Sequence, residues 1–307
     1  MTLLDAVGET PLLPLPRIAA EVPGLRLLAK AEYLNPGGSV KDRPVRAMLR
    51  DGIASGRLAP GKTILEATSG NTGIAFARLG RTLGYPTTIC IPEKASALRK
   101  AILRAHGAEL IFTDPLEGTD GAIRKARAMA AAHPETYFYP DQYSNPANPQ
   151  AHEEGTGPEI WRDCGGRLDA FVAGLGTSGT FVGTTRFLKK RSRRIVCVSV
   201  EPDGPVHGLE GMKHMATAMR PAIYDPTLAD RWLAMATEEA YAMCRRLARE
   251  EGVLVGPSAG ANVAAALRAA IEAREAGPSP AAAELTVVTI LCDAGGRYLS
   301  DPFWEEP

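Results

Sequence analysis

Lys41 is the residue in this sequence whose position most favours chemistry. It follows a turn at 35–38, reading NPGG, and opens a stretch of helical pattern. Ser39 with Asp42 three residues later is a capping-box pattern, which predicts that a helix begins at Ser39. The positive end of a helix disfavours an ammonium ion, so a lysine there loses its proton readily and can act as a nucleophile or base. An ordinary solvated lysine is the alternative, and this stretch alone leaves both open.

A glycine-rich turn at 174–180, reading GLGTSGT, follows an expected strand and opens an expected helix. It fits the G-x-G-x-x-G pattern of dinucleotide-binding proteins, and Glu201 stands where such proteins place an acidic residue for the ribose. An NAD-binding oxidoreductase is therefore one interpretation. The same glycines let backbone amides reach any anion at a helix N-terminus. The hydroxyls of Thr177, Ser178 and Thr180 favour the terminal phosphate of a cofactor with one phosphate.

A second turn between an expected strand and an expected helix lies at 68–73 and reads TSGNTG. Its amides, hydroxyls and amide side chain stand at a positive helix end, where they suit a small carboxylate. An ordinary N-cap run of Ser and Thr is the alternative. With Lys41 and a phosphate loop in the same chain, the sequence favours the carboxylate site.

The stretch at 56–63, GRLAPGKT, fits the P-loop pattern of nucleotide-binding proteins. A P-loop leaves a strand and enters a helix, so that the amides of the helix end hold the phosphates. Here an expected helix precedes the stretch and an expected strand follows it. We therefore interpret Lys62 as a surface turn residue.

The composition excludes several classes of partner. The chain carries 35 Lys plus Arg and 35 Asp plus Glu, so its formal net charge of zero gives no support to nucleic acid or an anionic membrane as a partner. No apolar run reaches the length of a membrane span, and the first residues lack a signal-peptide pattern, so we expect an untargeted, soluble protein of the cytoplasm. The five cysteines are scattered, which predicts neither a disulfide framework nor a zinc site.

Strands and helices alternate along the chain, which predicts an α/β fold of two domains, each with a mostly parallel twisted sheet flanked by helices. The length of 307 residues also favours two domains. We expect an N-terminal domain at 1–147 with Lys41 and a mobile carboxylate-binding part, and a C-terminal domain at 148–307 with the phosphate loop. For residues 1–35, packing on the second domain is an alternative that the sequence leaves open. The segment 141–158, rich in Pro, Gly, Asn and Gln, is the predicted crossing. Strands are expected at 25–34, 63–67, 87–92, 108–113, 136–140, 168–174, 194–202, 253–256 and 284–293.

Six motifs, in this order, resemble those of cysteine synthases (O-acetylserine sulfhydrylases), which are fold-type II, tryptophan synthase β-like enzymes dependent on pyridoxal 5'-phosphate. They are NPGGSVKDR around Lys41, TSGNTG at 68–73, DQYSNPANPQAH at 141–152, GTGPEIW at 155–161, GLGTSGT at 174–180 and DAGGRYLS at 293–300. The resemblance extends over nearly the whole chain.

The resemblance implies a role for each matching residue. Lys41 would hold pyridoxal 5'-phosphate as a Schiff base and move the proton at the substrate Cα. Asn71 would donate to the ring hydroxyl oxygen, and Ser258 would face the pyridine nitrogen. A hydroxyl there does not stabilise a protonated ring, which favours β-elimination over transamination. The remaining cofactor contacts would come from Gly176, Thr177, Ser178, Gly179 and Thr180 at the phosphate. The substrate carboxylate would meet Thr68, Ser69, Gly70, Thr72 and Gln142. No metal is implied.

The implied reaction is β-replacement on an O-activated L-serine, through an aminoacrylate intermediate, to give L-cysteine. The sulfur donor stays open among sulfide, thiosulfate and a carrier-protein thiocarboxylate. O-acetylserine is the expected substrate. Relatives that use O-phosphoserine carry an arginine in the stretch matching 201–215, where this chain has Glu210, although Lys213 and His214 could supply positive charge instead. The sequence Ala97-Leu98-Arg99 also lacks the glutamate that the family commonly has before this arginine, so domain closure could differ.

Other interpretations stay open at this point. A cystathionine β-synthase-like replacement shares the core motifs, and a non-catalytic homologue that binds pyridoxal phosphate would keep the cofactor site. Relatives are dimers, so we expect a homodimer whose partners are a small amino-acid substrate and a sulfur donor. A complex with a serine acetyltransferase is not decided by the sequence.

Overall fold

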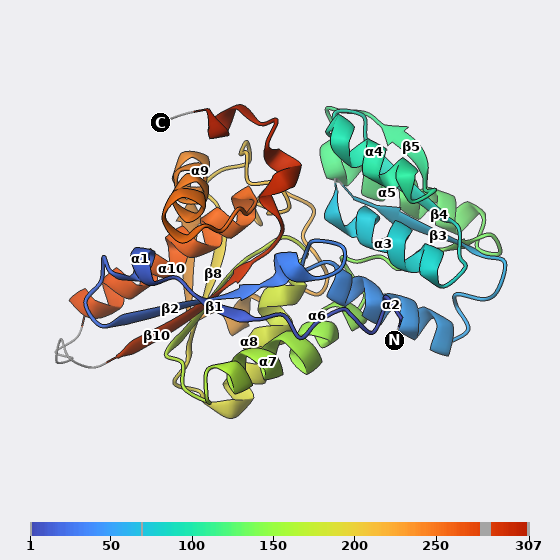
Figure 1. The fold of residues 1–307 in the computed structure, drawn as a ribbon. Coiled ribbons are helices and arrows are strands. Elements are labelled where there is room, and N and C mark those ends of the chain that lie inside the picture. The colour runs from blue at the N-terminus through green and yellow to red at the C-terminus, as the bar shows by residue number, and fades with distance from the viewer. Residues whose placement is uncertain (1, 69, 277–283, 306–307) are drawn as a thin grey trace.

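The computed structural model describes residues 2–68, 70–276 and 284–305, and contains two sheets, each flanked by helices (Figure 1). The larger sheet has the strand order β1-β2-β10-β7-β8-β9 and the smaller one has the order β5-β4-β3-β6. In the described part of the chain every strand pairing is parallel except that of β1 with β2. The predicted fold class is therefore confirmed.

The six-stranded sheet combines strands from both ends of the chain. Its strands are β1 (Leu12–Pro14), β2 (Leu25–Ala31), β7 (Ala170–Gly174), β8 (Val196–Pro202), β9 (Arg231–Met235) and β10 (Leu285–Leu291). β10 lies between β2 and β7, and its sequence LTVVTIL is rich in β-branched residues, as expected of a parallel strand covered on both faces. Because β2 pairs with β10, the N-terminal strands lie in the sheet of the C-terminal half.

Two sets of helices cover the two faces of this sheet. Because side chains alternate along a strand, Val287 belongs to one apolar core and Val288 to the other. The first core is closed by α1 (Pro16–Ala19), α9 (Thr237–Arg246) and α10 (Pro257–Glu275). The second is closed by α7 (Gly157–Asp163) and α8 (Gly179–Arg191).

The four-stranded sheet is built in the same way. Ile64 faces α2 and α3, whereas its neighbour Leu65 faces α5. The strands are β3 (Thr63–Ala67), β4 (Thr87–Pro92), β5 (Glu109–Thr113) and β6 (Tyr137–Phe138). The helices are α2 (Asp42–Ala54), α3 (Asn71–Thr82), α4 (Ala97–Ala105) and α5 (Gly118–Ala132).

Some elements differ from the sequence predictions. The segment 141–158, predicted as a domain crossing, contains α6 (Ala147–Ala151), a π-helical stretch at His152–Thr156 and the first turn of α7. Its Pro and Asn residues begin a helix instead of preventing one, because the Asn145 side chain accepts from the Ala147 amide at 2.9 Å. The strand predicted at 253–256 contributes only a bridge between Val255 and Ala294.

The remaining helical segments are short. A second π-helical stretch spans Leu247–Glu251, and single 3-10 turns span Glu32–Leu34, Pro226–Leu228, Gly295–Tyr298 and Pro302–Trp304. Among the helices of the described residues, none combines the length and the apolar content needed to cross a bilayer.

Candidate active site

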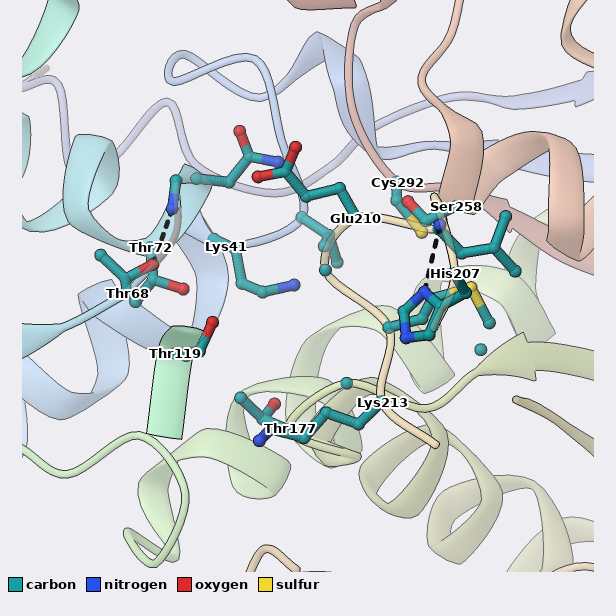
Figure 2. A pocket seen from close by; sticks show the side chains of 18 of the residues that line it. Lys41, Thr68, Thr72, Thr119, Thr177, His207, Glu210, Lys213, Ser258 and Cys292 are labelled. Atoms are coloured by element: carbon teal, nitrogen blue, oxygen red, sulfur yellow. Dashed lines mark hydrogen bonds between the residues drawn. The ribbon is translucent and has the colours of Figure 1, made fainter. Parts of the chain in front are cut away.

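A cavity of about 620 Å³ lies where the two sheets meet, and both contribute residues to its wall. Of the predicted site residues, the described ones all line it: Lys41, Thr68, Gly70, Asn71, Thr72, Gln142, Gly176, Thr177, Ser178, Gly179, Thr180 and Ser258. Ser69 is outside the described residues. Figure 2 shows Lys41 reaching toward the middle of this cavity, with Thr68 and Thr72 on one side and Ser258 on the other.

Lys41 lies at the N-terminal end of α2, but the helix begins three residues later than the sequence predicted. Asp42 is its first residue, and Ser39 is not the cap. Ser39 instead forms a β-bridge with Asp293, while the Asp42 carboxylate accepts from the Gly37 amide. The backbone at Ser39 is therefore held against the segment that follows β10, which prevents the earlier helix start.

A buried ionic cluster anchors α2 two residues after Lys41. The Arg43 guanidinium, 1% exposed, donates to both carboxylate oxygens of Glu32, at 2.7 and 2.8 Å, and to both of Glu159, at 2.7 Å each. Lys30 of β2 adds a contact to Glu159 at 2.9 Å. Burial opposes ionisation of Glu159, but the hydrogen bonds from Arg43 and Lys30 outweigh it and lower its pKa to about 2. The cluster fixes α2 to β2 and α7.

The glycine loop between β7 and α8 has the close packing that its sequence requires. A Cβ at Gly176 would lie 2.1 Å from the Gly211 carbonyl oxygen, and one at Gly179 would lie 2.0 Å from Asn148 Oδ1. Ser178 adopts the left-handed conformation, with φ of 71°, and its buried hydroxyl has no partner among the described residues. A loop of amides and an unpartnered hydroxyl at the start of α8 fits an anion such as a phosphate.

His152 supports this loop from the π-helical stretch. Its Nε2 lies 3.3 Å from Thr180 Oγ1 and its Nδ1 lies 2.9 Å from Thr156 Oγ1. Burial, with the charges of Arg43 and Lys41, lowers the pKa of His152 well below 6.5, so the imidazole is neutral. The sequence pattern at 141–152 did not indicate this role for His152.

The turn at 68–72 is joined to Gln142. Thr72 donates to Gln142 Oε1 at 2.8 Å, and Gln142 Nε2 donates to the Ala67 carbonyl at 2.9 Å. The Thr68 hydroxyl accepts from the Gly70 amide at 3.0 Å. These contacts hold the predicted carboxylate-binding groups together at the start of α3.

Asn71, Ser258 and Cys292 complete the wall around Lys41. Asn71 is held by Asp293 and Arg297, which both lie in the segment after β10. Neither residue was predicted from the sequence to have a role in the site. Ser258 is in the first turn of α10 and is 9% exposed. Burial raises the pKa of the neighbouring Cys292 thiol to about 11, so it is a neutral neighbour of Lys41 and not a nucleophile.

Two ion pairs cross the cavity. Arg99 of α4 pairs with Glu210, and Lys213 donates to Asp120 of α5 at 2.9 Å. Of the two cations that the sequence analysis considered for a phosphate leaving group, Lys213 lines the cavity and His214 does not belong to its wall.

Two sequence patterns have other structural roles. The P-loop-like stretch lies between the end of α2 and the start of β3, and Lys62 donates to the Pro134 carbonyl at 2.9 Å, which confirms a turn residue. Glu201, considered as a ribose ligand, accepts from the Met215 amide at 2.8 Å.

Comparisons with known proteins agree with one another. The family model described as "Pyridoxal-phosphate dependent enzyme" matches residues 3–293. A cysteine synthase of Aquifex aeolicus is 43% identical, over 99% of this chain and 92% of its own. The crystal structure of cysteine synthase from Entamoeba histolytica has a TM-score of 0.91 at 36% identity, covering 100% of this chain and 91% of that one. An O-acetylserine dependent cystathionine β-synthase from Helicobacter pylori has a TM-score of 0.90 at 36% identity, and the match covers 99% of this chain and 98% of that one.

Proposed function

The chain belongs to the pyridoxal-phosphate dependent enzymes, and we propose that it converts an O-activated L-serine to L-cysteine by β-replacement, as a cysteine synthase does. The observation that carries this proposal is the meeting of a lysine, an anion-binding loop and a carboxylate-binding turn in one cavity. In such an enzyme, the lysine would bind the reactive carbon of the cofactor, the loop would bind its phosphate, and the turn would bind the carboxylate of the substrate.

The residues present fit pyridoxal 5'-phosphate. The loop at 176–180 would hold its phosphate, Asn71 would meet the ring oxygen and Ser258 would meet the ring nitrogen, while Lys41 would bind its aldehyde carbon. When bound, the cofactor supplies an electron sink for bond cleavage at the amino-acid Cα and Cβ. Once the substrate amine has displaced it from the cofactor, Lys41 would take the proton from the substrate Cα and later return a proton to the Cα of the product. The turn at 68–72 and Gln142 bind the substrate carboxylate.

O-acetyl-L-serine, with sulfide as the donor, is the proposed substrate. The cations Arg99 and Lys213 at the cavity are already paired with Glu210 and Asp120, which suits the uncharged acetyl ester of the substrate better than a doubly charged phosphate ester. O-phospho-L-serine is the second candidate, because the Lys213 ammonium lines the cavity and is only 9% exposed.

Cysteine formation by the holoenzyme tests both candidates. The protein is incubated with sulfide and either O-acetyl-L-serine or O-phospho-L-serine, and cysteine is measured. We expect the acetyl substrate to react faster, and Lys41→Ala to lose at least about a hundredfold in rate, the size of a general acid–base contribution. Lys213→Met separates the two candidates, since it should slow the phosphorylated substrate much more than the acetylated one, for which it only loosens the contact with Asp120.

Three outcomes would contradict the proposal. Absence of cysteine from both substrates would favour a non-catalytic homologue, provided that the protein is yellow with bound cofactor. Faster reaction with homocysteine than with sulfide would favour a cystathionine β-synthase-like enzyme. A colourless protein that binds NAD would favour the oxidoreductase.

We further propose a cytoplasmic homodimer, in line with the dimers expected for cysteine synthases. Light scattering coupled to size-exclusion chromatography tests the assembly, and a mass corresponding to one 32.6 kDa chain would reject it. Adding a serine acetyltransferase to the same measurement tests whether the two enzymes associate.

A further inference from the structure

We propose that Asp293 and Arg297 are positioning residues, which orient the side-chain amide of Asn71 so that it presents an N–H to the ring oxygen of the cofactor. The inference rests on the cofactor site of the proposed function. It adds to that site two residues that do not themselves contact the reacting atoms.

The contacts of Asn71 allow one orientation of its amide. Its Nδ2 donates to Asp293 Oδ2 at 2.7 Å, and its Oδ1 accepts from the Arg297 guanidinium. The opposite orientation would set two donors against each other at Arg297 and two acceptors against each other at Asp293. An asparagine amide is usually ambiguous in a structure, but here a carboxylate and a cation determine it from both sides.

One hydrogen of the amide is left for the cavity. An asparagine Nδ2 carries two hydrogens, and Asp293 accepts one of them. The Oδ1 is already engaged by the positively charged Arg297. Because Asn71 also lines the cavity, the group that it offers to a bound molecule is the second N–H.

Asp293 is itself held in place. It is 1% exposed, and its Oδ2 also accepts from the Tyr298 hydroxyl at 2.6 Å. Burial and the nearby Asp293 raise the pKa of Tyr298 well above 10, so the phenol keeps the proton that it donates. A Cβ at Gly256 would lie 2.4 Å from Asp293 Oδ1, so the other oxygen is closely packed.

The same segment anchors the backbone beside Lys41. The Val40 amide donates to the Cys292 carbonyl at 2.8 Å, and the Ala294 amide donates to the Gly38 carbonyl at 3.2 Å. The stretch 292–297 therefore holds both the lysine that precedes α2 and the side-chain amide of Asn71, the first residue of α3. Their relative position is set from the end of β10, on the other sheet.

The chemical consequence concerns the ring oxygen of the cofactor. An N–H donor favours the ionised form of an oxygen, whereas an acceptor or an empty position favours the protonated form. The balance between these forms appears in the absorption spectrum of the bound cofactor, as the ratio of its yellow band to its near-ultraviolet band.

The test compares spectra of substrate-free holoenzymes at full cofactor occupancy. Asp293→Ala removes the acceptor of the Asn71 amide and should lower the yellow-to-ultraviolet ratio by roughly tenfold, the effect of losing one hydrogen bond to a charged acceptor. Asn71→Ala should do the same, and the double variant should change no more than Asn71→Ala alone. Tyr298→Phe is the matched control, because it removes a hydrogen bond to the same oxygen of Asp293 and leaves Asn71 bound.

An unchanged ratio in Asp293→Ala at full occupancy, or effects of Asp293→Ala and Asn71→Ala that add, would overturn the proposal. If Asp293→Ala does not fold, Arg297→Met carries the same test, because without the guanidinium the amide is free to turn. Failure here is separate from failure of the proposed function, since the spectra are recorded without substrate and cysteine formation by the unaltered protein is measured independently.

Discussion

His152 is a fully buried imidazole that joins the π-helical stretch to the glycine loop through Thr180. Its lowered pKa has a consequence for folding. The unfolded chain binds a proton at this histidine below pH 6.5, the ordinary value, whereas the folded chain does not. Stability therefore falls as the pH drops below 6.5, because the unfolded state then binds more protons.

Replacing His152 with glutamine should remove this dependence. The unaltered holoenzyme is expected to be the more stable at about pH 8, and its advantage over His152→Gln should shrink by up to about 1.4 kcal/mol per pH unit on acidification below the ordinary histidine value. Denaturant unfolding at a series of pH values measures the difference. His133→Gln, at an exposed position, is the control. A difference that stays constant with pH would contradict a neutral His152.

Most of the predicted site residues that line the cavity share a local sequence pattern. Thr68, Asn71, Gly176 and Thr177 are in turns where a parallel strand passes into a helix, so their role in the fold follows from short-range pattern. Asp293 lies in no such turn. Its importance comes from meeting Asn71, 222 positions away in sequence, and spacing along the chain does not encode that contact.

At the scale of elements, the ion pairs of Arg43 fix the position of α2 relative to its neighbours. Arg43 joins the helix that begins after Lys41 to Glu32 and to Glu159 of α7, and all three side chains are at most 6% exposed. A buried cation between two carboxylates contributes little net stability as a set, but removing Arg43 leaves Glu32 buried without this cation and Glu159 with Lys30 alone.

We therefore expect Arg43→Met to lower the free energy of unfolding by about 3–5 kcal/mol. Arg50→Met, on the same helix, is the matched control, because Arg50 faces Asp5 at 3.9 Å with both side chains about half exposed, and such pairs contribute little. Denaturant unfolding of both variants measures the contrast. Equal effects would mean that the cluster does not hold the helix.

The limits of prediction at this scale have physical causes. The capping pattern at Ser39 placed the helix start too early, because a tertiary β-bridge to Asp293 competes with the local cap. β9 was not predicted, since its five residues, RWLAM, include no β-branched side chain, unlike the runs of β8 and β10. Local sequence patterns predict an element well where tertiary contacts favour the same conformation, and poorly where a contact with a distant segment favours another.

At the scale of the whole molecule, the segment 203–222 joins the two sheets across the cavity. It follows β8 of the larger sheet, and reaches α4 through Glu210 and α5 through Lys213. The Asp120 carboxylate also accepts from the Met219 amide at 2.9 Å. Both ion pairs join this segment to helices of the smaller sheet, so they tie the two sides of the cavity wall together. The sequence indicated the two sheets but not this connection, which depends on how they are placed relative to each other.

Asp120→Asn should therefore loosen the segment without altering the chemistry. We expect hydrogen exchange at the Met219 amide to become roughly tenfold faster, because the amide loses a charged acceptor. Exchange at the Met215 amide, which donates to Glu201 at 2.8 Å, should stay the same. In cysteine formation, KM for the serine substrate should rise more than kcat falls, because the carboxylate holds the segment over the cavity and contacts no reacting atom. Equal acceleration at both amides would indicate general destabilisation, and a fall in kcat alone would place Asp120 in the chemical step.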